Sequence, residues 1–244
     1  MLLRVQDRIL LGLAFLEDLF EDLADAGGLM SFSYKQVYGF VPRRYRKRNF
    51  YKSVSYALKT KRIEKIVKKD EVYLRLTGQG KRKLVRDFPL VRFQNSHWDG
   101  FWRVLPYDIK EIKRYQRDRL RNKLRELDFK QFQKSVYLSP HPFEKEMSDF
   151  LETLKLEGKV SILLCQKIQG IDNKQLARKL WRLDQLNQKY KELIENLKKS
   201  PNEKDLKEIK AQYLELNSKD PFFPQELLPQ HWWREEGRRM LRKA

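Results

Sequence analysis

Hydrophobic and polar positions in the first third of the chain alternate with a helical period. Apolar residues recur every three or four positions over the first 26 residues, at Ile9, Leu13, Leu16, Phe20 and Leu23. This spacing predicts an amphipathic helix. Gly27-Gly28 is expected to end it, and a short helical segment near residues 34–38 follows before a break at Pro42.

A further helix is predicted in the basic segment after Pro42. Its inward face is expected to carry Phe50 or Tyr51, together with Val54, Ala57 and Leu58. The polar positions of the same helix fall on the opposite side, so Arg46, Lys47, Arg48, Lys52, Ser55 and Lys59 can point outward together.

Two short runs with period-2 alternation come next, at residues 63–67 and 72–76. The polar residues 68–71 between them predict a β-hairpin, and Thr77 is placed to cap a last helix through Leu84. This order of elements is that of a winged helix-turn-helix domain, whose third helix enters the major groove of DNA. We expect this domain over residues 1–92. A merely solvated basic face is the alternative interpretation.

The centre of the chain has the pattern of a β-α-β unit. Residues 101–107 predict a buried strand, and residues 129–138 predict one strand or a tight hairpin. Between them, Ile112, Leu120, Leu124 and Leu127 form one stripe of a helix. The other face of this helix is basic and carries Arg114, Arg117, Arg121, Lys123 and Arg125. It could be a dimer rim, a second DNA contact or solvated surface.

A second helix is expected over residues 143–156 and an apolar strand over 160–168. Residues 173–199 predict one long helix, which Ser200-Pro201-Asn202 separates from another around residues 206–216. Prolines in the tail DPFFPQELLPQHWW prevent a continuous helix. Its aromatic and leucine side chains must therefore pack against other parts of the chain, within a helical region that we expect at residues 171–244.

Composition narrows the class of protein. A chain of 244 residues suits two or three small domains, and a net charge of +20 favours an anionic partner, most commonly nucleic acid. Ribosomal and membrane-surface proteins can have the same charge balance. The single cysteine, Cys165, is expected in a core rather than in a disulfide or a zinc site. We found no signal peptide and no apolar run long enough to span a membrane, so the expected location is the cytoplasm.

Several strings in the centre and the tail resemble the PaaX family of bacterial transcriptional repressors. They are Trp98-Asp99-Gly100, Tyr107-Asp108-Ile109, Arg117-Asp118, Leu120-Arg121, the segment from Gln133 to Pro140, and the tail from Asp220. Leu76-Thr77-Gly78-x-Gly80 also looks like the end of a winged domain in such proteins. Where relatives usually have glycine soon after the tail tryptophan, this chain has Trp233-Arg234.

The resemblance implies an α+β fold with a central ferredoxin-like βαββαβ domain, here over residues 93–170, that forms a homodimer. It also implies a repressor of an inverted-repeat operator in double-stranded DNA, released by an aryl-coenzyme A thioester. The candidate DNA-contacting residues are Arg43, Arg44, Arg46, Lys47, Arg48, Lys52, Ser55, Lys59, Lys68 and Lys69.

Asp108 leaves an enzymatic alternative open. Tyr107-Asp108-Ile109 and Gln133 to Tyr137 are also similar to the small ferredoxin-like nuclease of CRISPR adaptation, in which an aspartate at this place holds a divalent metal. Asp108 and Glu111 equally have the spacing of a helix capping box. No nucleophile elbow, phosphate loop or zinc spacing is present. We therefore expect no catalytic residue, metal or cofactor and no enzymatic activity.

Overall fold

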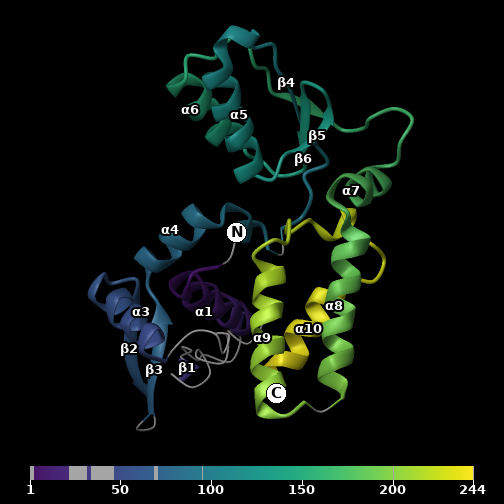
Figure 1. Ribbon diagram of the computed structural model, residues 1–244. Coiled ribbons are helices and arrows are strands. Elements are labelled where there is room, and N and C mark those ends of the chain that lie inside the picture. The colour runs from purple at the N-terminus through teal and green to yellow at the C-terminus, as the bar shows by residue number, and fades with distance from the viewer. Residues whose placement is uncertain are drawn as a thin grey trace. The chain divides into compact units, whose positions relative to one another are not determined.

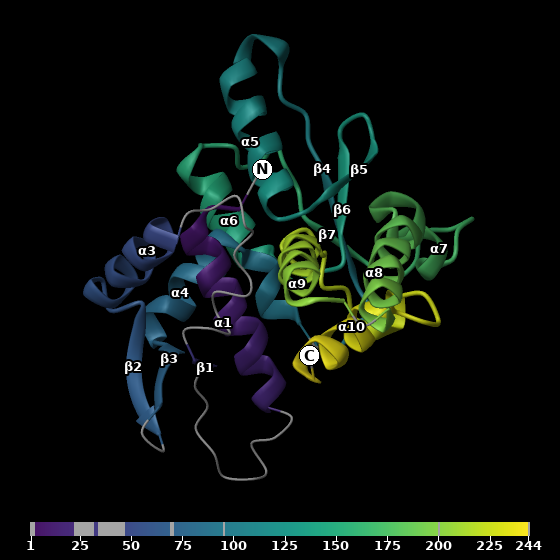
Figure 2. The same ribbon diagram turned by 60° about the horizontal axis from the view of Figure 1, so that its bottom comes forward.

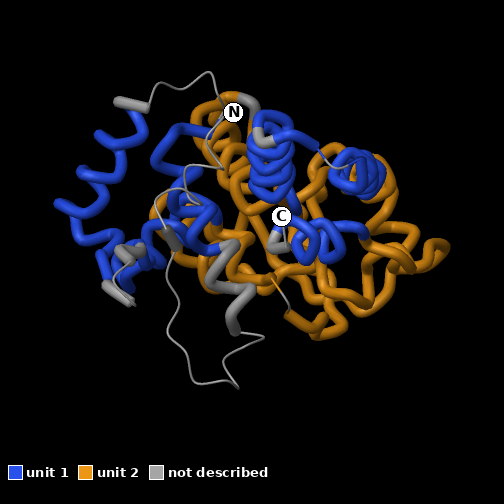
Figure 3. Tube along the Cα trace, turned by 90° about the horizontal axis from the view of Figure 1, so that it is seen from below, with its two compact units in different colours: residues 1–88, 187–220, 233–244 blue, residues 89–186, 221–232 orange. Residues whose placement is uncertain are grey.

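The structure, a computed structural model, describes residues 3–21, 32–33, 47–68, 71–94, 96–199 and 201–243. It is an α+β fold with a three-stranded and a four-stranded sheet among these residues. The chain divides into two compact units (Figure 3). Unit 1 contains residues 1–88, 187–220 and 233–244, and unit 2 contains residues 89–186 and 221–232.

Among the described residues, the N-terminal part of unit 1 contains the predicted first helix, basic helix, hairpin and last helix, in that order. Helix α1 (Val5–Glu21) and strand β1 (Phe32–Ser33) are followed by α3 (Lys47–Lys59), the hairpin β2 (Ile63–Lys68) and β3 (Glu71–Leu76), and helix α4 (Gly78–Asp87). The hairpin is confirmed, with Val67 paired to Val72. Strand β1, which the sequence did not predict, adds to the other side of β3. Gly27-Gly28 and the helical segment predicted at residues 34–38 lie outside the described residues.

Three helices form the C-terminal part of unit 1 (Figures 1 and 2). They are α8 (Leu183–Lys198), α9 (Glu203–Asn217) and α10 (Trp233–Lys243). The predicted break at residues 200–202 is confirmed, and the Asn202 side chain caps α9 by accepting from the Asp205 N–H at 3.0 Å. Helix α10 was not predicted. It approaches α9 closely at Gly237, where a Cβ would lie 2.8 Å from the Tyr213 ring. Glycine, which has no Cβ, permits this approach.

Buried polar contacts hold unit 1 together. The Arg8 guanidinium of α1 is fully buried, donates to the Ala211 carbonyl of α9 at 3.3 Å and lies 3.4 Å from the Glu215 carboxylate. Just after the C-terminal end of α9, the Arg234 guanidinium donates to the buried Asp220 carboxylate at 2.9 Å. Arg234 of the tail is therefore one half of a buried ion pair.

The prediction of one long helix over residues 173–199 is wrong. Helix α7 (Asn173–Trp181) ends at Arg182, which adopts a left-handed conformation with φ of 52°, and α8 starts at Leu183. The helical spacing of leucines continues across the break, so periodicity gave no signal of it. Trp181 packs in the core of unit 2, whereas α8 from Asn187 onward belongs to unit 1.

Unit 2 contains a four-stranded antiparallel sheet. Its strands are β4 (Trp102–Pro106), β5 (Lys130–Gln133), β6 (Val136–Ser139) and β7 (Leu163–Cys165), with α5 (Arg114–Glu126) after β4 and α6 (Glu144–Thr153) after β6. The spatial order is β5-β6-β4-β7. This is the predicted ferredoxin-like βαββαβ arrangement. Of the two alternatives for residues 129–138, the structure has the hairpin, formed by β5 and β6.

Both faces of this sheet are covered. Leu105 and Tyr137 face a core shared with α5 and α6, whereas Trp102 and Leu138 face a core shared with α7. Figure 1 shows α5 and α6 on one side of the sheet and α7 on the other. The tail completes these cores, with Phe222 in the first and Phe223, Leu227 and Leu228 in the second. The expectation that its apolar side chains pack elsewhere is confirmed.

Three local predictions in unit 2 are wrong. Ile112 is 91% exposed, because α5 begins only at Arg114, after a 3-10 turn over Glu111–Lys113. For the same reason Asp108 and Glu111 do not form a capping box: Lys110 precedes the turn and Lys113 precedes the helix, each without a side-chain cap. The predicted strand at 160–168 shortens to Leu163–Cys165 at the sheet edge. Cys165 is half-buried and packs against the core shared with α7.

None of the helices within the described ranges has the length and apolar composition needed to cross a bilayer.

Candidate nucleic-acid interface

Helix α3 separates apolar from polar side chains as its sequence predicts. Phe50, Val54 and Ala57 are at most 2% exposed, and the helix packs on α1. Of the two alternatives for the first inward position, Phe50 is the buried residue, and Tyr51 is 57% exposed. These inward residues fix the rotation of α3 and leave its opposite side to solvent.

Lys52, Ser55 and Lys59 lie exposed on that opposite side. They are spaced by three and four residues, so they follow one another along a single face. Of the other candidate residues, Arg43, Arg44, Arg46 and Lys69 lie outside the described residues. Lys47 and Arg48 begin α3 and Lys68 ends β2, but only their backbone positions are described.

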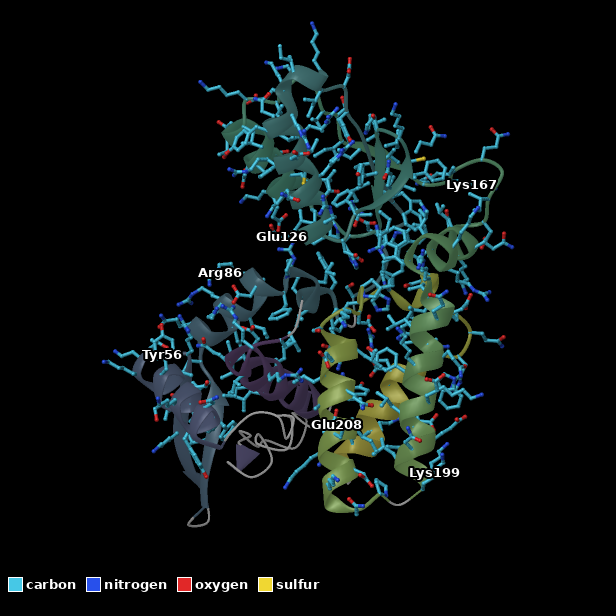
Figure 4. All side chains as sticks on the ribbon, viewed as in Figure 1. Tyr56, Arg86, Glu126, Lys167, Lys199 and Glu208 are labelled. Carbon is cyan, nitrogen blue, oxygen red and sulfur yellow. The ribbon has the colours of Figure 1, made fainter. Side chains whose placement is uncertain are left out.

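Sequence reasoning missed two tyrosines and an arginine on the same surface. Tyr56 is 51% exposed and projects from α3 (Figure 4). Tyr51 is 57% exposed on the other side of the Lys52, Ser55 and Lys59 row. The Arg62 guanidinium carbon lies 5.3 Å from the Tyr56 ring centroid, which is a cation–π contact. Aromatic side chains at outward positions of a basic helix were the available signal, because tyrosine can stack and donate a hydrogen bond.

The junction between the hairpin and α4 explains the Leu76-Thr77-Gly78-x-Gly80 string. The predicted cap is confirmed: the Thr77 hydroxyl accepts from the Gly80 N–H at 3.1 Å and donates to the Lys61 carbonyl at 2.6 Å. A Cβ on Gly80 would lie 2.0 Å from the Arg62 carbonyl oxygen. Glycine at this position therefore lets α4 approach the end of α3, which positions the hairpin relative to that helix.

Helix α4 adds exposed cations that sequence reasoning did not single out. Lys81, Arg82 and Arg86 are exposed, and Figure 4 labels Arg86 on this helix. Asp87 forms ion pairs with both Lys83 and Arg86. The spacing of basic residues around Leu84 was the signal in the sequence that could have identified these cations.

The Trp98-Asp99-Gly100 string in unit 2 is structural. Gly100 has φ of 84°, so the chain turns there before entering β4. Asp99 forms an ion pair with the buried Arg103, which also donates to Glu144 at 2.7 Å and to the Pro140 carbonyl at 3.1 Å. The hydrogen bond from Arg103 keeps the pKa of Asp99 below its usual value. The string and the start of α6 are thus joined through one arginine.

Asp108 is exposed at the end of β4, and its N–H donates to the Lys159 carbonyl at 2.8 Å. In the part of the chain that the structure describes, no three His, Cys, Asp or Glu side chains come together as a metal site.

Residues 95–177 match the sequence profile of the PaaX protein central Cas2-like domain. This segment is similar to the central domain of PaaX proteins. The match confirms the resemblance seen in the central strings of the sequence. The chain is also similar in fold to the uncharacterized protein Rv0674 from Mycobacterium tuberculosis, with a TM-score of 0.54 and 15% sequence identity over 93% of this chain and 92% of that one. No curated protein is similar enough to count as a match.

In this PaaX-like segment, His141 follows the string from Gln133 to Pro140 and connects it to the tail. Its ring is 2% exposed, stacks on Phe93 with centroids 4.4 Å apart, and donates from Nε2 to the Pro221 carbonyl at 2.6 Å. Burial lowers the pKa of His141 to about 4. The histidine is therefore neutral at physiological pH and holds the D-P-F-F-P segment in place.

Proposed function

We propose that this protein is a DNA-binding transcriptional regulator, a repressor that binds an inverted-repeat operator as a homodimer. The similarity of its centre to the PaaX central domain supports the regulator class. The order of elements from α1 to α4 supports a winged helix-turn-helix, with α3 as the recognition helix and β2–β3 as the wing. The observation that carries the proposal is the outward row of Lys52, Ser55 and Lys59 on α3, opposite its buried face.

On this proposal α3 enters the major groove, where Lys52, Ser55 and Lys59 approach base edges and phosphates. Lysine can donate to the guanine acceptors, and a serine hydroxyl can both donate and accept. Tyr51 and Tyr56 flank the row and can donate hydrogen bonds to phosphate oxygens. The basic residues between Arg43 and Lys69 supply the sequence-independent part of the affinity by neutralising phosphates.

Repression is then steric, because two copies bound to the two halves of an operator cover a promoter. We also propose that an aryl-coenzyme A thioester releases the protein from DNA. This part of the proposal rests on the family resemblance alone. In the structure, the tail side chains Phe222 and Phe223 are at most 4% exposed and belong to the cores of unit 2. A thioester site would therefore have to lie elsewhere or displace them.

The test begins by footprinting the bound sites in the genome, which gives an operator. A titration by mobility shift then compares the native chain with Lys52→Ala/Lys59→Ala. Loss of two phosphate or base contacts should lower operator affinity by at least tenfold and reduce the discrimination against a scrambled duplex.

A matched control is Lys174→Ala/Lys179→Ala, which removes the same charge from exposed positions of α7. It should bind the operator like the native chain. Equal operator affinity of the native chain and the α3 variant would refute the assignment of α3 as the recognition helix.

A further inference from the structure

The arginines of α5 gather on one flank of the helix in unit 2. Arg114, Arg117, Arg121 and Arg125 are spaced by three and four residues, so they lie within about 80° of the helix circumference. This flank borders the buried stripe of Leu120 and Leu124. It extends over about 16 Å at 1.5 Å per residue.

Two of these arginines, Arg121 and Arg125, form no ion pair with a carboxylate among the described side chains. Asp118 lies at the edge of the flank, 3.6 Å from Arg114, and both side chains are more than half exposed. Glu126 forms an ion pair with Lys123 on the other side of the helix. Arg121 and Arg125 are therefore suited to bind an external anion.

The sheet holds part of the row in position. The Arg121 Nε donates to the Tyr107 hydroxyl at 3.1 Å, which fixes the direction of that guanidinium. Tyr137 lies beside Arg121 and Arg125: burial raises the pKa of its hydroxyl, and the two guanidiniums act in the opposite direction. Arg121 is thus placed by a contact with Tyr107, just after β4, and not only by the helix.

We propose that the α5 flank is a second DNA-binding surface that contacts the phosphate backbone of a duplex without reading its sequence. The proposal extends the proposed function, on which it rests for the identity of the ligand. A guanidinium binds phosphate oxygens through two parallel hydrogen bonds. At a rise of 3.4 Å per nucleotide, a row of about 16 Å spans roughly five nucleotides of one strand. Arginines on a helix flank, without amide or hydroxyl side chains among them, favour affinity over base selectivity.

The test uses the full chain and a fluorescent duplex of mixed sequence, titrated at several salt concentrations. The variant Arg121→Gln/Arg125→Gln removes two charges from the flank. A second variant, Arg114→Gln/Arg125→Gln, keeps the hydrogen bond between Arg121 and Tyr107. The control is Lys174→Gln/Lys179→Gln on α7 of the same unit. Circular dichroism checks that each variant folds.

Both flank variants should reduce the slope of log affinity against log salt by about 2, and at 0.1 M salt they should weaken binding by up to about 60-fold. In each flank variant, the ratio of operator affinity to mixed-sequence affinity should equal that of the native chain. The control should change neither quantity. If the flank variants bind the mixed duplex as the control does, or if they lose affinity for the operator alone, the second surface is refuted.

The two proposals fail separately. If the α3 variant loses its preference for the operator and the α5 variants bind DNA like the native chain, the regulator assignment stands and the second surface is refuted. If the α5 variants lose DNA affinity and the α3 variant keeps its preference for the operator, DNA binding by α5 stands and α3 is refuted as the recognition helix. A flank variant that loses affinity for single-stranded DNA or duplex RNA instead of duplex DNA would refute the proposed ligand.

Discussion

The buried ion pair between Asp220 and Arg234 gives a measurable test of how unit 1 is built. Both side chains are at most 6% exposed, and the two charges lie 2.9 Å apart. The Tyr190 hydroxyl donates to the second Asp220 oxygen at 2.9 Å, and the Tyr213 hydroxyl donates to the Arg234 carbonyl at 2.7 Å. These contacts join α8, α9 and α10 around one carboxylate.

Replacing Asp220 by alanine removes the fully buried partner of the Arg234 guanidinium, which keeps the partly exposed Glu235 carboxylate 3.0 Å from its Nε. The expected loss is about 3 kcal/mol of unfolding free energy, at the lower end of the cost of breaking a buried ion pair, because Glu235 still compensates part of the charge. Arg234→Met removes the other charge and leaves Asp220 with the Tyr190 hydroxyl, so a smaller loss is expected. Tyr190→Phe, the milder control, should cost about 1–3 kcal/mol by removing one donor to a buried acceptor.

Urea unfolding followed by circular dichroism measures these losses, and the double variant Asp220→Ala/Arg234→Met measures the coupling. The double variant should be more stable than the sum of the single losses predicts, because neither charge is then left alone. A cost below about 1 kcal/mol for Asp220→Ala, or strictly additive losses, would refute the view that this pair is buried and coupled.

Two further predictions concern unit 2. The folded-state pKa of His141 is about 4, which is below its unfolded value near 6.5. The neutral ring therefore stabilises the fold fully above pH 6.5, and this contribution is lost as pH falls toward 4. The unfolding free energy should fall by about 2 kcal/mol between pH 7 and pH 5 for this reason. In His141→Asn this fall should be smaller by the same amount, and an unchanged pH dependence would contradict the assignment. Duplex DNA, single-stranded DNA and RNA incubated with the purified chain and magnesium should stay intact, since Asp108 alone is a poor ligand set for a divalent cation. Cleavage that Asp108→Asn abolishes would favour a nuclease.

Periodicity alone determined much of the local structure. The inward residues Phe50, Val54 and Ala57 of α3, the hairpin, and the Thr77 cap all follow from spacing and turn chemistry between neighbouring residues. The ferredoxin-like order of the central strands also agrees with the sequence, because each amphipathic element has one face that must be buried. The candidate residues Lys52, Ser55 and Lys59 were found this way, as the polar remainder of α3.

Only the tertiary structure decided the features that depend on residues distant in the chain. The break at Arg182 lies within continuous helical spacing, and it follows from the packing of Trp181 in one unit and Tyr190 in the other. Strand β1 is two residues long and exists because β3 has a free edge. The sequence likewise could not pair Arg234 with Asp220 or His141 with Pro221. Hydrophobic period reports which face of an element is buried, but a buried polar group is stable only beside a specific partner, and folding alone brings that partner near.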